Sequence, residues 1–393
     1  MQDVFLAAPV RTAIGDFGGI FKDIPGNELA MVPIKECIKR SGIDPAELDD
    51  VIFGNCFMRT DEPNVARVAA LKAGIPFHVP GMTIQRQCSS SMQAAVFAMQ
   101  RIQCGDADMI LVGGMESMSQ APYVLKDARW GKRLMHGQLT DTVWEGLTCP
   151  NTGLIMGITA ENLAEKYSIT REEQDVVALR SHMNASDAAK SGRFADEIVP
   201  VEITGRKGDK TLLATDEHIR HDLTIEALAK LKPTFKKDGT VTPGNSSGLN
   251  DGASAALVVS ESKAKALGLK PIARFVSHAV AGVEPELMGY GPVPATRKAL
   301  TRAGMSLSQI GLVEVNEAFA AQYLACEKLL ELDRSITNVN GSGIGLGHPV
   351  GATGLRLLIT LSHEMRRRSV KYGLATLCVG GGMGKAVILE NVA

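Results

Sequence analysis

A chain of 393 residues exceeds the usual size of one compact core, so we expect two or three structural units. Hydrophobic residues make up 45%, charged residues 22%, and the formal net charge is −1, which excludes an electrostatic basis for binding nucleic acid or an anionic membrane. The sequence contains no run of 18 apolar residues, so it predicts no membrane-spanning helix.

Short apolar runs separated by helical patterns predict an α/β fold layered around largely parallel sheets. The run at residues 4–8 follows the acidic Asp3, so we expect a first strand there rather than a signal peptide. Further strands are expected near residues 50–54, 109–113, 254–259, 312–315, 336–340 and 374–379.

The region between about 119 and 248 differs from the rest of the chain, with scattered charge and little strand pattern. Its clearest helix is expected to begin at Thr170, whose spacing to Glu173 matches a capping box, and to end near Ala189. We expect this region to be an insertion folded over the core, where it can supply walls of a ligand site.

Two turns of small residues carry one cysteine and one histidine at corresponding points of a weak internal repeat. One turn contains Cys88 and the other contains His348, and each lies between a strand-like run and a helical pattern. Each helical pattern leads to a second apolar run followed by Gly-Gly-Met, and Cys378 ends the second of these runs. Two thiols and one imidazole suit chemistry through a thioester.

Each of these residues also has a structural interpretation. Cys88 at the start of a helix would have its thiol pKa lowered by unpaired N–H groups and the helix dipole, yet a free cysteine is commonly a core residue. His348 lies in a glycine-rich turn with little local reason to be a core residue, so it is a candidate base. Cys378 could pack within its strand, and Asn316 could be an N-cap or a site residue.

The seven cysteines form an odd number without CxxC pairs. This usage fits free thiols better than a disulfide framework or a structural zinc site. We therefore expect the protein to work in the reducing environment of the cytoplasm.

Seven sequence blocks, in order along essentially the whole chain, closely resemble the thiolase family. The last three blocks contain Asn-Glu-Ala-Phe, Gly-His-Pro and Cys-Val-Gly-Gly-Gly. The blocks lie at residues 9–15, 88–90, 113–119, 244–253, 316–319, 347–351 and 378–382. The resemblance implies a layered αβαβα core of two similar halves with a large inserted loop domain. The implied segments are residues 1–118 (N-terminal half), 119–248 (loop domain, for CoA binding and oligomer contacts), 249–270 (return to the N-terminal half) and 271–393 (C-terminal half).

The resemblance also implies a role for each site residue. An acyl-CoA thioester would acylate Cys88, with His348 as the activating base, and Cys378 would then remove a proton from the α-carbon of a second acetyl-CoA. His348 and a water held by Asn316 would stabilise the enolate, while the backbone N–H groups of Cys88 and Gly380 would stabilise the tetrahedral intermediate. A side chain at Gly380 could obstruct those N–H groups.

Substrate contacts follow from the same resemblance. Arg220 would lie near the nucleotide end of CoA, and Ser247 near the pantetheine amide. The acyl and pantetheine channel would be lined by Met156, Phe235, Met288, Ala318 and Phe319; for Phe235 and Met288, core packing is an equally good interpretation. No metal or organic cofactor is implied, because acetyl-CoA, CoA and 3-ketoacyl-CoA are substrates. Residues 119–145 resemble the loop that joins two dimers, so a homotetramer or homodimer is expected.

The implied activity is reversible condensation of two acetyl-CoA molecules to acetoacetyl-CoA. Short-chain biosynthetic members usually have Cys-Gly-Ser-Gly where this chain has Cys-Ser-Ser-Ser at residues 88–91, and His where it has Ile155. Residues 118–123 and 154–159 are similar to those of degradative members. One methylene group changes a pocket's discrimination between acyl chains by only about 1 to 3 kcal/mol. A degradative 3-ketoacyl-CoA thiolase of broader chain length, acting in fatty-acid β-oxidation, therefore stays an alternative.

Other classes fit less well. Residues 341–347 are similar to a dinucleotide-binding turn, but this fingerprint needs an acidic residue at the end of the next strand, and that strand ends in Cys-Val-Gly at residues 378–380. His218 and His221 have metal-like spacing without an evident third ligand. A ketosynthase would use two histidines where this chain has His348 and Cys378, and an inactive thiolase-fold binding subunit is a remote alternative.

Overall fold

The computed structural model describes residues 2–204 and 208–393. The N-terminal elements are β1 (Val4–Thr12), β2 (Gly15–Asp16), α1 (Gly26–Ser41), β3 (Asp50–Gly54), α2 (Val65–Lys72), β4 (Gly81–Ile84), α3 (Ser90–Gln103) and β5 (Met109–Ser117). After the inserted region come β11 (Asn250–Ser260), α8 (Glu261–Ala266), β12 (Ala273–Gly282), α9 (Pro292–Ala303), β13 (Leu312–Val315), α10 (Ala320–Leu330), α11 (Gly343–Leu346), α12 (Val350–Arg368), β14 (Tyr372–Val379) and β15 (Met383–Asn391).

The inserted region contains short strands and helices. They are β6 (Tyr123–Val124), β7 (Thr140–Asp141), α4 (Thr142–Gly146), α5 (Met156–Tyr167), α6 (Arg171–Lys190), β8 (Ile198–Val199), β9 (Val201–Thr204), β10 (Lys210–Leu213) and α7 (Ile225–Ala229). Single 3₁₀ turns lie at Pro45–Glu47, Met118–Gln120, Pro285–Tyr290 and Leu307–Gln309.

The main strands form one sheet in which two halves repeat the same pattern. The order is β13-β14-β15-β12-β1-β11-β5-β3-β4. In the first half β3 pairs parallel with β5, and β5 pairs antiparallel with β11; in the second half β13 pairs parallel with β14, and β14 antiparallel with β15. The two halves meet where β1 pairs with β12 at Phe5–Arg274 and Leu6–Ala273. The predicted repeat is therefore confirmed.

The expectation of largely parallel sheets is wrong. The long pairings of β11 with β1 and β5, and of β15 with β12 and β14, are all antiparallel. For β14 and β15 the reason is connectivity: a tight turn of three residues joins them, and a short connection of this kind can only reverse the chain.

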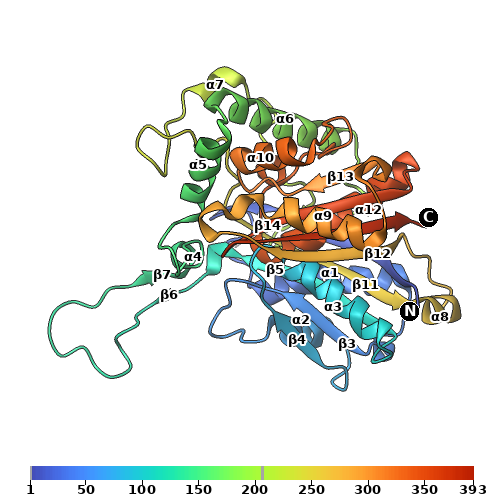
Figure 1. Ribbon diagram of the computed structural model, residues 1–393. Helices are drawn as coiled ribbons and strands as arrows, with labels where there is room; N and C mark the ends of the chain where they lie inside the picture. Colours follow the sequence, from blue (N-terminus) through green and yellow to red (C-terminus); the bar gives the residue numbers. More distant parts are fainter. Residues whose placement is uncertain (1, 205–207) are drawn as a thin grey trace.

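Helices α3 and α12 lie between the two half-sheets and form the middle layer (Figure 1). Helices α1 and α2 cover the other face of the N-terminal strands, while α9 covers the other face of β12 and β15. Helix α12 is buried along its length as far as Met365, as a central helix must be. This confirms the α/β class with an αβαβα layering, and it places Cys88 and His348 just before the two central helices.

Two local predictions have different outcomes. Helix α6 begins after Thr170, which forms a capping box with Glu173, as predicted. The strand predicted at residues 336–340 is wrong: Thr337 makes an isolated bridge to Val313, and Asn338 has a φ of 49° that ends any extended run.

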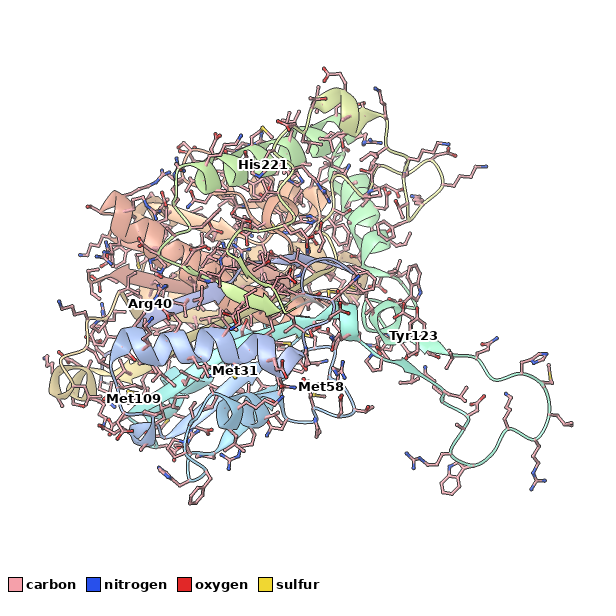
Figure 2. The ribbon with its side chains drawn as sticks, turned by 180° about the vertical axis from the view of Figure 1, so that it is seen from behind. Met31, Arg40, Met58, Met109, Tyr123 and His221 are labelled. Carbon is pink, nitrogen blue, oxygen red and sulfur yellow. The ribbon has the colours of Figure 1, made fainter. Side chains whose placement is uncertain are left out.

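The inserted region is tied to the first strand by a buried ion cluster. Arg11 donates to both carboxylate oxygens of Asp216 at 2.7 and 2.9 Å and to Glu197 at 2.8 Å. Helices α5 and α6 pack against α10, while β6 and β7 pair at the base of an extended loop that projects from the body, with Tyr123 at its start (Figures 1 and 2). The exact segment boundaries stay a prediction. Within the described residues no helix is long and apolar enough to cross a membrane.

Candidate active site

The turn before α3 holds Cys88 at the floor of a cavity. Gln87 has a φ of 43°, a region that costs a residue other than glycine energy and must be held by its surroundings. The hydroxyl of Ser90 donates to the Gln87 carbonyl at 2.6 Å and accepts from the Arg86 N–H at 2.8 Å, and the Cys56 thiol donates to the same carbonyl at 3.1 Å. These bonds fix the turn that presents Cys88.

The backbone N–H groups of Cys88 and Gly380 lie beside the Cys88 sulfur. They favour its thiolate, but burial has the larger effect and raises the pKa of the Cys88 thiol to about 11. The expectation that the helix start lowers this pKa is therefore wrong, because removal of water outweighs the dipole and the two N–H groups. At neutral pH Cys88 is a thiol.

His348 is held by contacts on three sides. Its backbone N–H donates to Asn250 Oδ1 at 2.8 Å, its Nδ1 lies 2.7 Å from Thr353 Oγ1, and its Nε2 lies 3.5 Å from Asn316 Nδ2. Gly347 before it has a φ of 99°, and a Cβ there would lie 2.8 Å from Asn250, so this position requires glycine.

The imidazole of His348 is neutral. Burial, with a further contribution from the charge of Arg356, lowers its pKa to about 3. A neutral imidazole has a lone pair that can accept a proton, as a general base requires. His348 and Cys88 line the same cavity, so the structure brings a thiol and an unprotonated base together.

Cys378 is the second-last residue of β14 and is fully buried. Burial raises its pKa well above the ordinary value, and interaction with the nearby Cys88 raises it further. The two sulfurs are thus close enough to affect each other's ionisation. Cys378 packs in the core and also lies near Cys88. Its interpretation as a core residue and its interpretation as a site residue are therefore compatible.

The turn after Cys378 requires glycine at its second and third positions. An added Cβ at Gly380 would make only ordinary contacts with the protein, 3.6 Å from Gln87 and 3.7 Å from Met156, so the obstruction of its N–H toward substrate stays a prediction. Gly381 and Gly382 both have φ of 86°, and a Cβ at Gly382 would lie 2.4 Å from the Val283 carbonyl. The turn from β14 to β15 therefore requires the later pair, and this turn positions the Gly380 N–H.

The cavity has a volume of about 760 Å³ including its mouth. Its walls include most of the residues predicted to contact substrate. The lining residues are Gln87, Cys88, Met118, Gly146, Leu147, Ile155, Met156, Gly157, Phe235, Ser246, Ser247, Gly248, Leu249, Met288, Ala318, Phe319, His348, Val350 and Gly380. A largely apolar channel with one thiol and one imidazole at its floor suits an acyl thioester with a pantetheine arm.

Phe235 and Met288 both line the cavity and also pack in the core cluster around α10. Phe235 stands edge-on to Phe319, with ring centroids 6.2 Å apart. A Cβ at Gly157 would lie 2.3 Å from the Phe235 ring, so the start of α5 needs glycine for this wall to form.

Neither Asn316 nor Arg220 is among the residues that line the cavity. Asn316 is not an N-cap, since α10 begins four residues later; its amide nitrogen faces His348, and its buried Oδ1 has no protein partner among the described residues. Arg220 does not line the cavity: its side chain is 58% exposed and pairs with Asp16 at 3.3 Å. The place predicted for Arg220, near the nucleotide end of CoA, stays a prediction.

Three residues that support the site were missed in the sequence. Besides Thr353 and Asn250, Glu116 at the end of β5 accepts from the Gly351 N–H at 2.8 Å and the Asn55 side chain at 2.7 Å, joining the start of α12 to the N-terminal half. Burial raises the pKa of Glu116 to about 7. Glu116 and Asn250 fall inside matched sequence blocks, which was the available signal.

The two histidines with metal-like spacing have other partners. His218 Nδ1 bonds to Asp16, and His221 Nδ1 lies 2.8 Å from Ser186 Oγ. Across residues 2–204 and 208–393, no group of three His, Cys, Asp or Glu side chains is arranged to hold a metal ion.

Comparison with known proteins gives consistent matches along the chain. The family models described as thiolase N-terminal domain and thiolase C-terminal domain match residues 4–262 and 269–391. The chain is 52% identical over 392 residues to an acetyl-CoA acetyltransferase of Pseudomonas aeruginosa, covering 100% of both. The crystal structure of the Bacillus anthracis acetyl-CoA acetyltransferase is similar with a TM-score of 0.98 at 54% identity, covering 100% of this chain and 99% of that one. The crystal structure of human mitochondrial 3-ketoacyl-CoA thiolase in complex with CoA is also similar, with a TM-score of 0.96 at 45% identity. The match covers 100% of this chain and 98% of that one.

Proposed function

Because this chain belongs to the thiolase family, we propose that it is an acetyl-CoA acetyltransferase that joins two acetyl-CoA molecules into acetoacetyl-CoA and CoA, and reverses this reaction by thiolysis. The observation that carries the proposal is the floor of the cavity. There the Cys88 thiol and Gly380 line one apolar cavity together with the neutral imidazole of His348.

In the first half-reaction Cys88 attacks the thioester carbonyl of acetyl-CoA while its proton passes to His348 Nε2. The oxygen that gains charge is stabilised by the N–H groups of Cys88 and Gly380. The tetrahedral intermediate then breaks its bond to the CoA sulfur, which takes the proton of Cys378 and leaves as CoA. The products of this step are acetyl-Cys88, an imidazolium at His348 and a thiolate at Cys378.

In the second half-reaction the Cys378 thiolate removes a proton from the α-carbon of another acetyl-CoA. Burial raises the pKa of Cys378, which makes its thiolate a stronger base for this difficult proton. The imidazolium of His348 and a water held by Asn316 stabilise the enolate oxygen. The carbanion attacks acetyl-Cys88, and the Cys88 sulfur leaves and recovers its proton from His348, so every proton is accounted for.

These steps need only thiols, an imidazole and backbone N–H groups, so we propose that CoA thioesters are substrates and that no metal or organic cofactor takes part. Both reactive cysteines must stay reduced, and all seven cysteines of the chain are free thiols. This supports a reducing compartment such as the cytoplasm as the place of action.

A degradative 3-ketoacyl-CoA thiolase of broader chain length is the second candidate. The observation that favours it is the apolar wall of Leu147, Ile155 and Leu249 around the cavity, which could accept more methylene groups. A thiolysis series with 3-ketoacyl-CoA substrates of increasing length separates the two. A steep fall in kcat/KM beyond four carbons is expected, and a flat or rising profile would favour the degradative candidate.

We also propose that the chain forms a homotetramer in which the loop between β6 and β7 joins two dimers. Apolar side chains that would be costly to leave in water lie on this loop: Trp130 and Met135 are each 91% exposed, and Leu134 is 83% exposed. Light scattering should give a tetramer for the natural chain and a dimer when these three residues are changed to serine. A monomeric natural chain would contradict the proposal.

A further inference from the structure

One hydroxyl group holds the ring of His348. Nδ1 of His348 lies 2.7 Å from Oγ1 of Thr353, which is one turn into α12, and neither residue is more than 6% exposed. The same hydroxyl lies 2.9 Å from the backbone carbonyl of Pro349. Water is therefore largely excluded, and these two neighbours determine where the hydroxyl proton points.

The protons around Thr353 can be assigned by counting donors. A backbone carbonyl can only accept, and a helical threonine commonly donates to the carbonyl four residues before it, so the one proton of the Thr353 hydroxyl is assigned to the Pro349 carbonyl. The hydroxyl then offers a lone pair to His348, and a hydrogen bond at 2.7 Å requires a proton on Nδ1. In the neutral ring this leaves Nε2 without a proton.

The Nε2–H tautomer of His348 fits less well with the neighbours on both sides of the ring. If Nδ1 carried the lone pair, Thr353 would have to turn its proton to it. The Pro349 carbonyl would then lose its hydrogen bond from the hydroxyl and keep those from the Ala352 and Thr353 N–H groups at 2.9 and 3.0 Å. On the other side of the ring, Asn316 presents its amide nitrogen, a donor, 3.5 Å from Nε2. A donor beside Nε2 agrees with a lone pair there.

The partner of Nδ1 is neutral, which distinguishes this site from one where a carboxylate orients the histidine. The charged side chain that acts on the ring is Arg356, whose positive charge opposes protonation. Thr353 can therefore orient the ring while His348 stays neutral in the resting protein. When Nε2 later takes a proton, the bond from Nδ1–H to Thr353 is unchanged, so no reorganisation is needed.

We propose that Thr353 is a positioning residue that fixes His348 as the Nδ1–H tautomer and so leaves Nε2 unprotonated in the cavity that Cys88 also lines. The consequence for catalysis rests on the proposed function, whereas the tautomer is a property of the resting protein. The two can therefore be tested separately.

The tautomer is tested first by ¹⁵N NMR of the natural protein labelled at its histidine nitrogens. The His348 signals are identified by their loss in His348→Asn. We expect a protonated Nδ1 and an unprotonated Nε2 at pH 7. A protonated Nε2 in the natural protein would overturn the proposal, even if every variant failed to fold.

The role in catalysis is tested with Thr353→Val, which keeps the shape and removes the hydroxyl, and Thr353→Ser, which keeps the hydroxyl. General-base steps typically contribute about 10²- to 10⁴-fold, so we expect kcat for acetoacetyl-CoA thiolysis to fall at least about tenfold in Thr353→Val, with KM within about twofold. Thr353→Ser should retain kcat within about threefold, and only Thr353→Val should lose the Nδ1–H signature.

Thr360→Val is the matched control, since Thr360 is a buried threonine on the same helix whose hydroxyl contacts Glu197 at 3.2 Å instead of His348. It should keep both kcat and the His348 signals. Equal loss of kcat in Thr353→Ser and Thr353→Val, or full activity in Thr353→Val, would overturn the proposal. If the natural protein shows the expected tautomer but no thiolysis, the proposed function fails and the positioning role of Thr353 in the resting ring stands.

Discussion

Burial sets the protonation states of the reactive side chains. It raises the pKa of the Cys88 thiol to about 11 and, with Arg356, lowers that of His348 to about 3. The resting pair is therefore a thiol and a neutral imidazole at pH 7, in contrast to the thiolate–imidazolium pair of some cysteine enzymes. In this account the nucleophile is generated only as the proton moves to His348 during attack, which limits unwanted reactions of a free thiolate.

The alkylation of Cys88 should follow its raised pKa. Below pH 11 the thiolate fraction grows about tenfold per pH unit, so the rate of iodoacetamide labelling at Cys88 should still be rising at pH 9. Peptide mapping measures labelling at this residue alone, and acetyl-CoA should slow it. A rate that levels off below pH 8 would show that the thiol ionises more easily than its burial implies.

The reactive residues could be predicted from the sequence, but their supporting contacts could not. Cys88, His348 and Cys378 lie in short local patterns. Thr353 and Asn250 act through hydrogen bonds to His348. Nothing in the local sequence distinguishes Thr353 from other small polar residues, and the matched block around Asn250 does not show which of its residues contacts His348. The balance between burial and dipole at Cys88 also depends on packing by distant segments, which is why the expected direction of its pKa shift was wrong.

At the scale of elements, the start of α5 shapes one wall of the cavity. In Gly157→Ala the added methyl would lie 2.3 Å from the Phe235 ring and force that ring to move. Overpacking of this kind typically costs about 1 to 3 kcal/mol, so we expect a lower midpoint of thermal unfolding and a higher KM for acetoacetyl-CoA.

Gly282→Ala serves as the control for this change, because its added methyl would have its nearest neighbour, the Gly382 carbonyl, at 4.0 Å. It should leave both quantities nearly unchanged. An unchanged KM in Gly157→Ala would show that Phe235 does not limit substrate binding.

The helices and strands also show where the local sequence is sufficient to predict secondary structure. Helix α6 carries its own start signal at Thr170 and was predicted closely. Strands β12 and β15 were not predicted as strands, and their direction in the sheet depends on chain reversal at Gly381 and Gly382. Residues 336–340 have strand-like composition, yet the turn at Asn338 leaves only an isolated bridge.

At the scale of the whole molecule, Arg11 holds the first strand to the inserted region. Arg11, Glu197 and Asp216 are all buried, so removal of the arginine leaves two carboxylates without their main partner. Breaking a buried ion pair in this way costs about 3 to 5 kcal/mol, and we expect Arg11→Leu to lower the free energy of unfolding by that amount in denaturant titration.

Arg59→Leu is the comparison for Arg11→Leu, because the side chains of Arg59 and Asp61 form a solvent-accessible pair at 2.7 Å. Exposed pairs contribute about 0 to 1 kcal/mol. If both variants lost equally little stability, the buried cluster would not be what joins the insertion to the core.

The central step of the proposed reaction is a covalent acetyl group that forms on Cys88 and leaves with the help of Cys378. Brief incubation with isotopically labelled acetyl-CoA, followed by acid quench and peptide mass spectrometry, locates that group directly. We predict label on Cys88 in the natural protein, accumulation of labelled Cys88 in Cys378→Ser as condensation fails, and none in Cys88→Ser. Label on another residue, or acetoacetyl-CoA formed without labelled Cys88, would contradict the account.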